Sequence, residues 1–183
     1  MNDTGQPVLY AIVCGSPASR HVGKLVDIGN EAGWDVCVVT TPDGRKFVDI
    51  EALELKTGHP VRSWYKDPGE PDLLPPADAL VVAPATCNTV AKWAAGISDT
   101  LPLGMLVEGV GKGLPVSCVV SSSAEQMRFP AIVDAMTKLA SWGVLMVDYP
   151  RTQIKPDEDR HAKSPWRAAF DAVTARRESR LSS

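Results

Sequence analysis

Small polar side chains follow several apolar runs of this sequence. They stand at Gly15, Ser16 and Pro17, at Thr41, at Thr86, Cys87, Asn88 and Thr89, and at Ser121 to Ser123. Where a strand ends and a helix begins, unpaired backbone N–H groups and a partial positive charge favour an anion such as a phosphate. Hydroxyl groups add hydrogen bonds without needing Lys or Arg. The pattern therefore predicts a site for a polar or anionic ligand.

Each polar group by itself is also ordinary turn or helix-cap chemistry, so only the combination favours a binding site. The chain contains neither GxGxxG nor GxxxxGK[ST]. These motifs mark dinucleotide-binding folds and nucleotide-hydrolysing P-loops. Their absence argues against both classes of protein.

The apolar runs that precede the polar groups alternate with helical patterns. Strands are expected over 8–14, 35–40, 79–83, 115–120 and 144–147, with a short one over 60–64, and helices over 18–32, 47–57, 89–96, 101–110 and 124–142. This alternation predicts an α/β protein with a doubly wound parallel sheet, a Rossmann-like three-layer α/β/α sandwich. Ligands of such sheets bind at the carboxyl ends of the strands, so the polar groups should converge on one edge.

Several local signals set the expected ends of these elements. Ser16 is suited to cap a helix that Pro17 opens, and Pro84 is expected to stop its strand. Residues 66–76 are rich in Pro and charge, which predicts a long loop. We expect a main domain over 1–150 and, over 151–183, a tail or a peripheral helix, the latter within 165–180.

Composition narrows the class of protein. With 183 residues, 44% of them hydrophobic, the chain is long enough for one well-filled core. A net charge of −3 without a basic cluster predicts no nucleic-acid partner. The 4 cysteines have no CxxC or Cys/His ligand spacing, so reduced thiols and no metal site are expected. No segment approaches the about 20 apolar residues of a membrane span, and no targeting segment is visible, so a soluble cytoplasmic protein is expected.

The stretch PATCNTVAKWAAGISDTL, residues 84–101, resembles the PxSANT segment and following helix of the homo-oligomeric flavin-containing cysteine decarboxylases. That group holds phosphopantothenoylcysteine decarboxylases and lantibiotic peptidyl-cysteine decarboxylases. CGSPAS at 14–19 and TPDGRKF at 41–47 are similar to its first two FMN loops, and the resemblance covers about residues 8–150. It implies FMN as cofactor and a homotrimer with the flavin between subunits. The implied cofactor contacts are Gly15, Ser16, Pro17, Thr41, Thr86, Cys87, Asn88, Thr89 and Ser121.

The chain departs from this family at positions that matter for catalysis. The decarboxylases carry a His fourteen residues before the Pro of the PxSANT segment, where this chain has Glu70. A carboxylate with an ordinary pKa of about 4 is a weaker base than imidazole. Ser123 falls on the Asn that binds the substrate carboxylate in the family, and no cysteine follows Cys118 to match the flap of the coenzyme A branch. The resemblance thus implies Glu70, Asn88 and Ser123 as catalytic positions, but not phosphopantothenoylcysteine as substrate.

Three interpretations stay open on the sequence. The chain is an FMN enzyme that oxidises, or oxidatively decarboxylates, a thiol-containing small molecule or peptide, with Glu70 or a water moving the proton. Alternatively, it is an FMN protein with another redox or carrier role, or a catalytically inactive regulatory or partner subunit. Among other residues, His59 is expected to be solvated or capping, Asp99 to cap a helix, and Cys87 to form a wall of the site.

Overall fold

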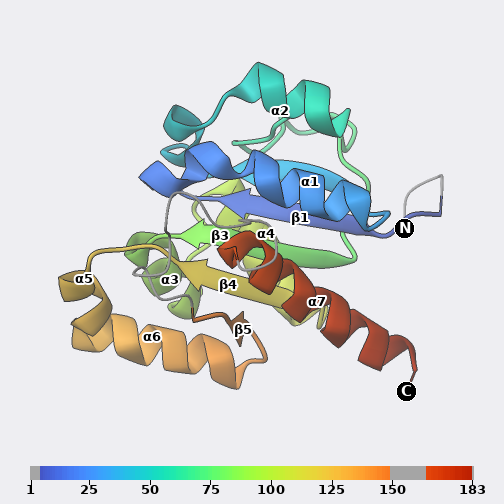
Figure 1. Ribbon diagram of the computed structural model, residues 1–183. Helices are drawn as coiled ribbons and strands as arrows, with labels where there is room; N and C mark the ends of the chain where they lie inside the picture. Colours follow the sequence, from blue (N-terminus) through green and yellow to red (C-terminus); the bar gives the residue numbers. More distant parts are fainter. Residues whose placement is uncertain (1–4, 149–163, 183) are drawn as a thin grey trace.

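One parallel sheet runs through the protein (Figure 1). The computed structural model describes residues 5–148 and 164–182. Within them, the sheet has 5 strands in the order β2-β1-β3-β4-β5, and every adjacent pair is parallel. The strands are β1 (Val8–Val13), β2 (Asp35–Thr40), β3 (Ala79–Ala85), β4 (Val116–Val120) and β5 (Leu145–Met146). This order confirms the expected doubly wound fold, because the strand order reverses between β1 and β3.

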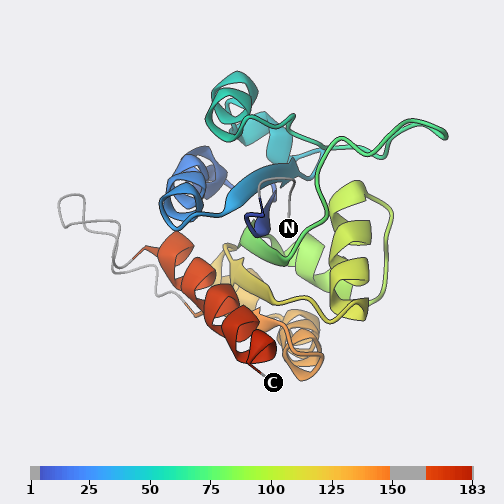
Figure 2. The ribbon, with the colours of Figure 1, turned by 90° about the vertical axis from the view of Figure 1, so that its right-hand side faces the viewer.

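Helices cover both faces of the sheet (Figure 2). One face packs against α1 (Gly23–Glu31) and α7 (Pro165–Leu181), the other against α3 (Cys87–Ala94), α4 (Leu101–Gly111) and α6 (Pro130–Ser141). The remaining described helices are α2 (Ile50–Thr57), α5 (Ala124–Arg128) and the short 3₁₀ helices η1 (Pro17–His21) and η2 (Gly44–Phe47). The three-layer sandwich thus has the architecture predicted from the alternating pattern.

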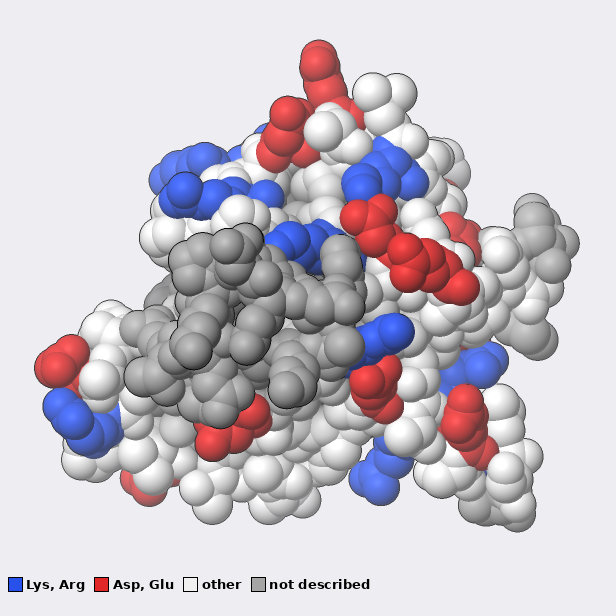
Figure 3. Space-filling view, in the orientation of Figure 1, with Lys and Arg blue, Asp and Glu red and all other residues white. Residues whose placement is uncertain are grey.

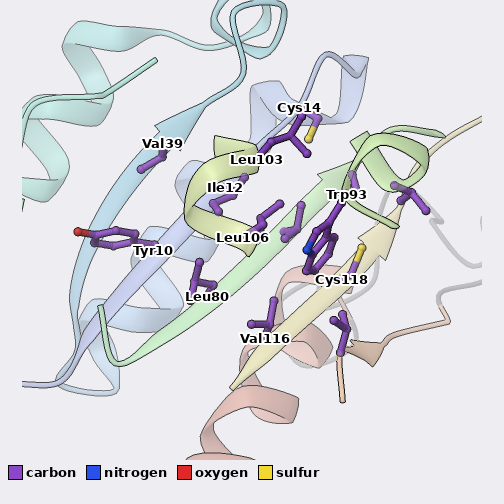
Figure 4. Close-up of a cluster of buried hydrophobic side chains, with 14 of the residues drawn as sticks. Tyr10, Ile12, Cys14, Val39, Leu80, Trp93, Leu103, Leu106, Val116 and Cys118 are labelled. Carbon is purple, nitrogen blue, oxygen red and sulfur yellow. The ribbon is translucent and has the colours of Figure 1, made fainter. Parts of the chain in front are cut away.

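The core is divided in two by the sheet because successive strand residues point to opposite faces. From β1, Tyr10 and Ile12 join Trp93 of α3 and Leu106 of α4 in one buried cluster, shown in Figure 4. The alternate residues of β1 join α1 and α7 in the second cluster. Every residue of β1 is buried, which explains the continuous apolar run that predicted this strand.

Helix α7 is part of this core packing. Trp166, Phe170 and Val173 are buried, and the Phe170 ring meets the Trp34 ring edge-to-face with centroids 5.8 Å apart. The hydroxyl of Ser117 on β4 donates to the Ala169 carbonyl at 2.8 Å. Of the two expectations for residues 165–180, the structure therefore shows the helix.

Several expected elements differ in the structure. The helix expected over 124–142 is divided into α5 and α6, because Phe129 before Pro130 takes an extended conformation with φ −63° and ψ 126°. The short strand over 60–64 is reduced to a single parallel bridge between Val39 and Arg62. Pro84 does not stop its strand, since β3 continues to Ala85 through a cis Ala83–Pro84 peptide and a register shift.

The start of the first helix follows its expected signals, although the helix itself is shorter. Ser16 is the N-cap of η1, Pro17 stands at its beginning, and α1 follows from Gly23. The loop expected over 66–76 holds no helix or strand and extends away from the body of the protein (Figure 2, green).

The distribution of surface charge and the apolar content of the helices are consistent with the composition of the chain. On the face in Figure 3, basic and acidic side chains lie next to one another, without a continuous basic surface among the described residues that it shows. No helix in the described part of the chain has both the length and the apolar character needed to cross a bilayer. All 4 cysteines are free and buried.

Candidate functional site

A cavity of about 910 Å³ lies at the carboxyl ends of the strands, where the strand order reverses. The sequence-predicted residues that line it are Gly15, Ser16, Pro17, Thr41, Thr86, Cys87, Asn88, Thr89, Ser121 and Ser123. They come from the loops after β1, β2 and β4 and from Thr86 with the first turn of α3 after β3, so the predicted convergence of polar groups is present. Glu70 does not line this cavity.

The loop after β1 is held against two other loops. Ser16 Oγ lies 3.2 Å from Ser121 Oγ, which joins the loops after β1 and β4. Ser16 Oγ also accepts from the backbone N–H of Ala18 at 3.4 Å, as expected of a helix cap. A Cβ on Gly15 would lie 3.0 Å from Asp43 Cβ, so the close approach of the loop after β2 favours glycine there.

The loop after β2 turns sharply at Thr41. The Thr41 N–H donates to the Val13 carbonyl at 2.8 Å, which continues the pairing of β2 with β1. Thr41 Oγ1 accepts from the Gly44 N–H at 2.9 Å and stabilises the turn into η2. In the same loop, the Lys46 ammonium bonds Asp43 at 2.6 Å and lowers the pKa of that carboxyl. Asp43 is thus an ionised group at the rim of the cavity.

The start of α3 forms the centre of the cavity wall. Thr86 is the N-cap, and its Oγ1 accepts from the Thr89 N–H at 3.4 Å. The Thr89 hydroxyl donates to Cys14 Sγ at 3.2 Å, and the Cys87 N–H donates to Ser122 Oγ at 3.0 Å. Asn88 is exposed on the cavity side of this first turn. The helix N-terminus and these hydroxyls provide partial positive charge and polar contacts for an anion.

Thr100 is a cavity residue that the sequence did not single out. Its Oγ1 is buried and has no hydrogen-bond partner among the described residues, although the residue lines the cavity. Thr100 is also the N-cap position of α4, whereas Asp99, the expected cap, pairs with Lys92 at 2.6 Å. The Asp99 expectation was therefore wrong, because the Lys92 ammonium lies within reach of its carboxylate. A buried hydroxyl without a partner is uncommon in folded proteins.

Ser122, within the predicted group Ser121 to Ser123, also lines the cavity. Other lining residues were not singled out, namely Ala18, Pro42, Asp43, Lys92, Leu103 and Gln126. Ala18, Pro42 and Asp43 lie within the stretches 14–19 and 41–47 that resemble FMN loops, so the sequence offers a signal for them. Lys92 and Leu103 come from the interiors of helices, where polar-loop patterns give no indication of a site.

Two of the catalytic positions implied by the resemblance have other contacts in the structure. Glu70 is exposed in the 66–76 loop, where its Oε2 accepts from the Asp67 N–H at 3.1 Å. Ser123 lines the cavity, but it is also the N-cap of α5 in a reciprocal capping box with Gln126. Neither residue places a base at the cavity in the described part of a single chain.

The cavity fits the cofactor that the resemblance implies. Its volume lies within the range of about 300–1,000 Å³ for cofactor sites. Hydroxyls and the first turn of α3 suit a phosphate, and Leu103 and Pro42 add apolar surface for a flat ring. Lys92 is the one cation among the described lining residues, and it is already paired with Asp99. Helix ends and hydroxyl groups are therefore the main partners that this wall offers to a phosphate.

Comparisons with known proteins agree with this fit. Residues 2–178 match the family described as Flavoprotein. The Coenzyme A biosynthesis bifunctional protein CoaBC of Escherichia coli (strain K12) is 28% identical over 140 residues, which cover 73% of this chain and 34% of that protein. The chain thus spans about a third of the length of the curated relatives it matches.

Solved structures show the same fold. The epidermin biosynthesis protein EpiD from Staphylococcus aureus is 25% identical with a TM-score of 0.65, over 79% of this chain and 84% of that protein. The FMN binding protein AtHal3 shares the fold at 20% identity with a TM-score of 0.73, over 95% of this chain and 98% of that protein. The family match spans nearly the whole chain, so this protein belongs to the Flavoprotein family.

Proposed function

We propose that this chain binds FMN in the cavity and oxidises a thiol-containing small molecule or a peptidyl cysteine, with loss of carbon dioxide from the substrate. Membership of the Flavoprotein family supports a flavin cofactor. The FMN-dependent cysteine decarboxylase SpaF shares the fold at a TM-score of 0.68 and 24% identity, which makes this cofactor and reaction class the first to test.

The residues at the helix starts hold the phosphate end of FMN. Ser16 at η1 and Thr86 with Thr89 at α3 contribute hydroxyls beside the partial positive charge of the α3 N-terminus. Asn88 and Thr100 supply polar contacts further along the wall. When bound, FMN would accept the two electrons removed from the substrate. The protein's own contribution is to position both molecules and to limit access of water.

The single observation that supports this assignment most strongly is the convergence of polar strand-end loops and the N-terminus of α3 on one cavity. Hydroxyls beside a helix N-terminus suit a phosphate, and the volume of the cavity suits a cofactor. FMN carries such a phosphate.

Proton transfer at this site is assigned to a water molecule rather than to Glu70. No histidine lines the cavity in the described part of the chain, and Glu70 lies in the extended loop. Ser122, Ser123 and Asn88 lie at the cavity and are suited to orient the carboxylate of a substrate.

The test starts with the visible spectrum of the purified protein. A flavin spectrum, or its appearance on titration with FMN, is expected in stoichiometric amount. The FMN-loaded protein is then incubated with a peptide ending in cysteine, and mass spectrometry should show loss of carbon dioxide and two hydrogens. The same peptide ending in serine is the matched control and should not change. A protein that binds no FMN refutes the proposal.

A second function is an FMN protein with a redox or carrier role and without decarboxylation. The absence of a cavity histidine from the described residues and the capping role of Ser123 favour it. Under this function, stoichiometric FMN is present and the flavin is reducible, but no cysteine peptide loses mass. A chain that binds neither FMN nor thiols would instead fit a regulatory or partner subunit.

The homotrimer implied by the resemblance is part of the same proposal. Several large apolar or aromatic side chains are more than half exposed in the single chain, among them Trp64, Tyr65, Leu73 and Phe129. They leave apolar surface for contact with neighbouring subunits. Light scattering on the FMN-loaded protein should give three times the mass of one chain. A monomeric mass at micromolar concentration would contradict this assembly.

A further inference from the structure

A second group of reactive side chains lies away from the cavity, at the amino end of β2. Asp35, Cys37 and His59 each offer one ligand atom, and these atoms all lie within 4.8 Å of one another. His59 Nε2 and Asp35 Oδ1 are 2.6 Å apart. Within the described residues, this is the one place where three potential metal ligands come together.

The fold positions the three groups from two segments. Asp35 and Cys37 alternate along β2, so their side chains point to the same face of the sheet. Because β2 is an edge strand, the segment after α2 can run beside it. Helix α2 ends at Gly58, whose φ of 72° turns the chain back, and His59 follows directly.

His59 is fixed on both sides in sequence. Its N–H donates to Thr57 Oγ1 at 3.2 Å. Beyond it, Arg62 pairs with β2 through two backbone hydrogen bonds. The Thr40 N–H donates to the Arg62 carbonyl at 2.8 Å, and the Arg62 N–H donates to the Val38 carbonyl at 3.3 Å. The backbone at His59 is therefore held close to β2, and the ring contact with Asp35 orients the imidazole toward the other two groups, a preorganisation that suits a metal site.

The donor set selects the class of metal. A thiol, an imidazole and a carboxylate together are the ligands of zinc, whereas magnesium and calcium prefer oxygen alone. Bonds of about 2.0–2.3 Å in a tetrahedral site place ligand atoms about 3.3–3.8 Å apart. Because the ligand atoms all lie within 4.8 Å of one another, no separation has to close by more than about 1.5 Å, while the short contact between His59 and Asp35 opens. Side-chain rotations supply changes of this size.

Charge and burial also fit a zinc ion. Cys37 is fully buried, whereas the side chains of Asp35 and His59 are 12% and 22% exposed and leave a route from solvent. Zinc binds a cysteine as the thiolate, so binding releases the thiol proton to solvent. The Cys37 thiolate and the Asp35 carboxylate then neutralise the two charges of the ion.

We propose that Asp35, Cys37 and His59 bind a zinc ion that ties the segment after α2 to the edge strand β2. Three protein ligands leave a fourth position for water. The site is separate from the cofactor cavity, since Cys37 on β2 and Thr41 directly after β2 are four residues apart along an extended chain, a distance of about 13 Å. It does not depend on the proposed flavin chemistry.

The test uses the full chain loaded with FMN and freed of metal with a chelator. Titration with zinc should give one bound ion per chain at micromolar or tighter affinity, release of a proton, and a higher melting temperature. Cobalt in place of zinc should give tetrahedral d–d bands at wavelengths longer than those absorbed by oxidised flavin. X-ray absorption of the zinc form should show one sulfur ligand.

Two substitutions and a control decide the assignment. His59→Gln keeps a hydrogen-bonding side chain but removes the imidazole, and Cys37→Ser keeps the size but removes the thiolate. Each should weaken zinc binding by at least about 100-fold, since even loss of an outer contact costs about 10–100-fold. His21→Gln, at an exposed histidine elsewhere, should not weaken it. If Cys37→Ser fails to fold, His59→Gln decides alone. Absence of stoichiometric zinc, or binding unchanged in His59→Gln, overturns the proposal.

Discussion

Thr100 tests whether the ligand reaches the start of α4, because the residue lines the cavity and its hydroxyl has no partner in the described part of the chain. Thr100→Val keeps the shape and removes the hydroxyl. Without ligand, the stability of the protein should stay the same or rise, because a buried group without a hydrogen bond is removed. With ligand, FMN affinity should fall about 5- to 10-fold, the effect of one hydrogen bond of about 1 kcal/mol.

Chemical unfolding of the FMN-free protein and fluorescence titration with FMN measure the two effects separately. Thr137→Val is the matched control, since Thr137 is exposed on α6 and bonds the Val133 carbonyl. A loss of stability with unchanged FMN affinity in Thr100→Val would show that this hydroxyl has no ligand to contact.

Asn88 tests where the cofactor lies along the wall. Asn88→Asp places a negative charge at the first turn of α3. The helix N-terminus tolerates this charge, but the charge repels an anionic or electron-rich ligand. FMN affinity should fall about 10-fold, or about 1.4 kcal/mol. The absorption spectrum of bound flavin should shift if Asn88 lies near the ring. Asn30→Asp on the exposed end of α1 makes the same charge change outside the cavity and should leave both unchanged.

Glu70 tests the source of the proton transfer. Because Glu70 is exposed and does not line the cavity, Glu70→Gln should change peptide turnover by less than about twofold, well below the about 10²–10⁴-fold contribution of a general base. Turnover is measured from the product mass over time at pH 7. A loss of a hundredfold with intact FMN binding would restore Glu70 as the base.

At the residue scale, the sequence predicted most of the cavity wall and missed particular members. Ser16, Thr41 and Thr86 were found because capping and turn chemistry is local and legible in the sequence. Thr100 and Lys92 were missed because their place at the wall depends on how α3 and α4 pack. Glu70 was placed by counting along a resemblance, which gives no information on where a Pro-rich loop extends.

At the element scale, helix α7 closes one face of the sheet, although it follows a stretch without clear patterning. Phe170→Ala should lower the free energy of unfolding by about 3 kcal/mol, because a buried aromatic ring is removed next to Trp34. Chemical unfolding measures this change. Leu55→Ala, at a side chain on α2 that is 87% exposed, should cost less than about 1 kcal/mol. Equal costs would mean that α7 does not contribute to the core.

The predictions of helices and strands were correct where the sequence pattern is local and wrong where the structure depends on more distant residues. Asp35–Thr40 is a strand as predicted, since an unbroken apolar run buried on both faces has few alternatives. The prediction of a single helix over 124–142 was wrong at Pro130. The apolar periodicity continues through this position, but the residue before a proline is kept out of the helical conformation. The Asp35, Cys37 and His59 group escaped a search for ligand spacing, because a turn after α2 brings His59 back to β2.

At the scale of the whole molecule, buried thiols predict how stability changes with pH. Burial raises the pKa of Cys14 and Cys118 above the ordinary value of 9.0. In the unfolded chain these thiols lose their protons near pH 9, whereas the folded protein retains them. The contribution of these thiols to the free energy of unfolding is therefore fully present below pH 9. It falls as the pH rises through 9, by at most about 1.4 kcal/mol per pH unit for each thiol.

Urea unfolding of the metal-free protein at pH 8 and pH 10 measures this fall. Cys118→Ala should be less stable at pH 8, because a buried side chain is shortened, but should lose less on going to pH 10. The same loss in both proteins would show that Cys118 does not contribute to the alkaline change.

The sequence alone determined the class of fold and the chemistry of the strand ends, because hydrophobic periodicity and helix-cap residues act over a few neighbouring positions. The tertiary structure decided which of those groups share one cavity, that Thr100 joins them, that Glu70 does not, and that Cys37 meets His59. These juxtapositions depend on strand order and helix packing, which are set by contacts between residues far apart in the chain.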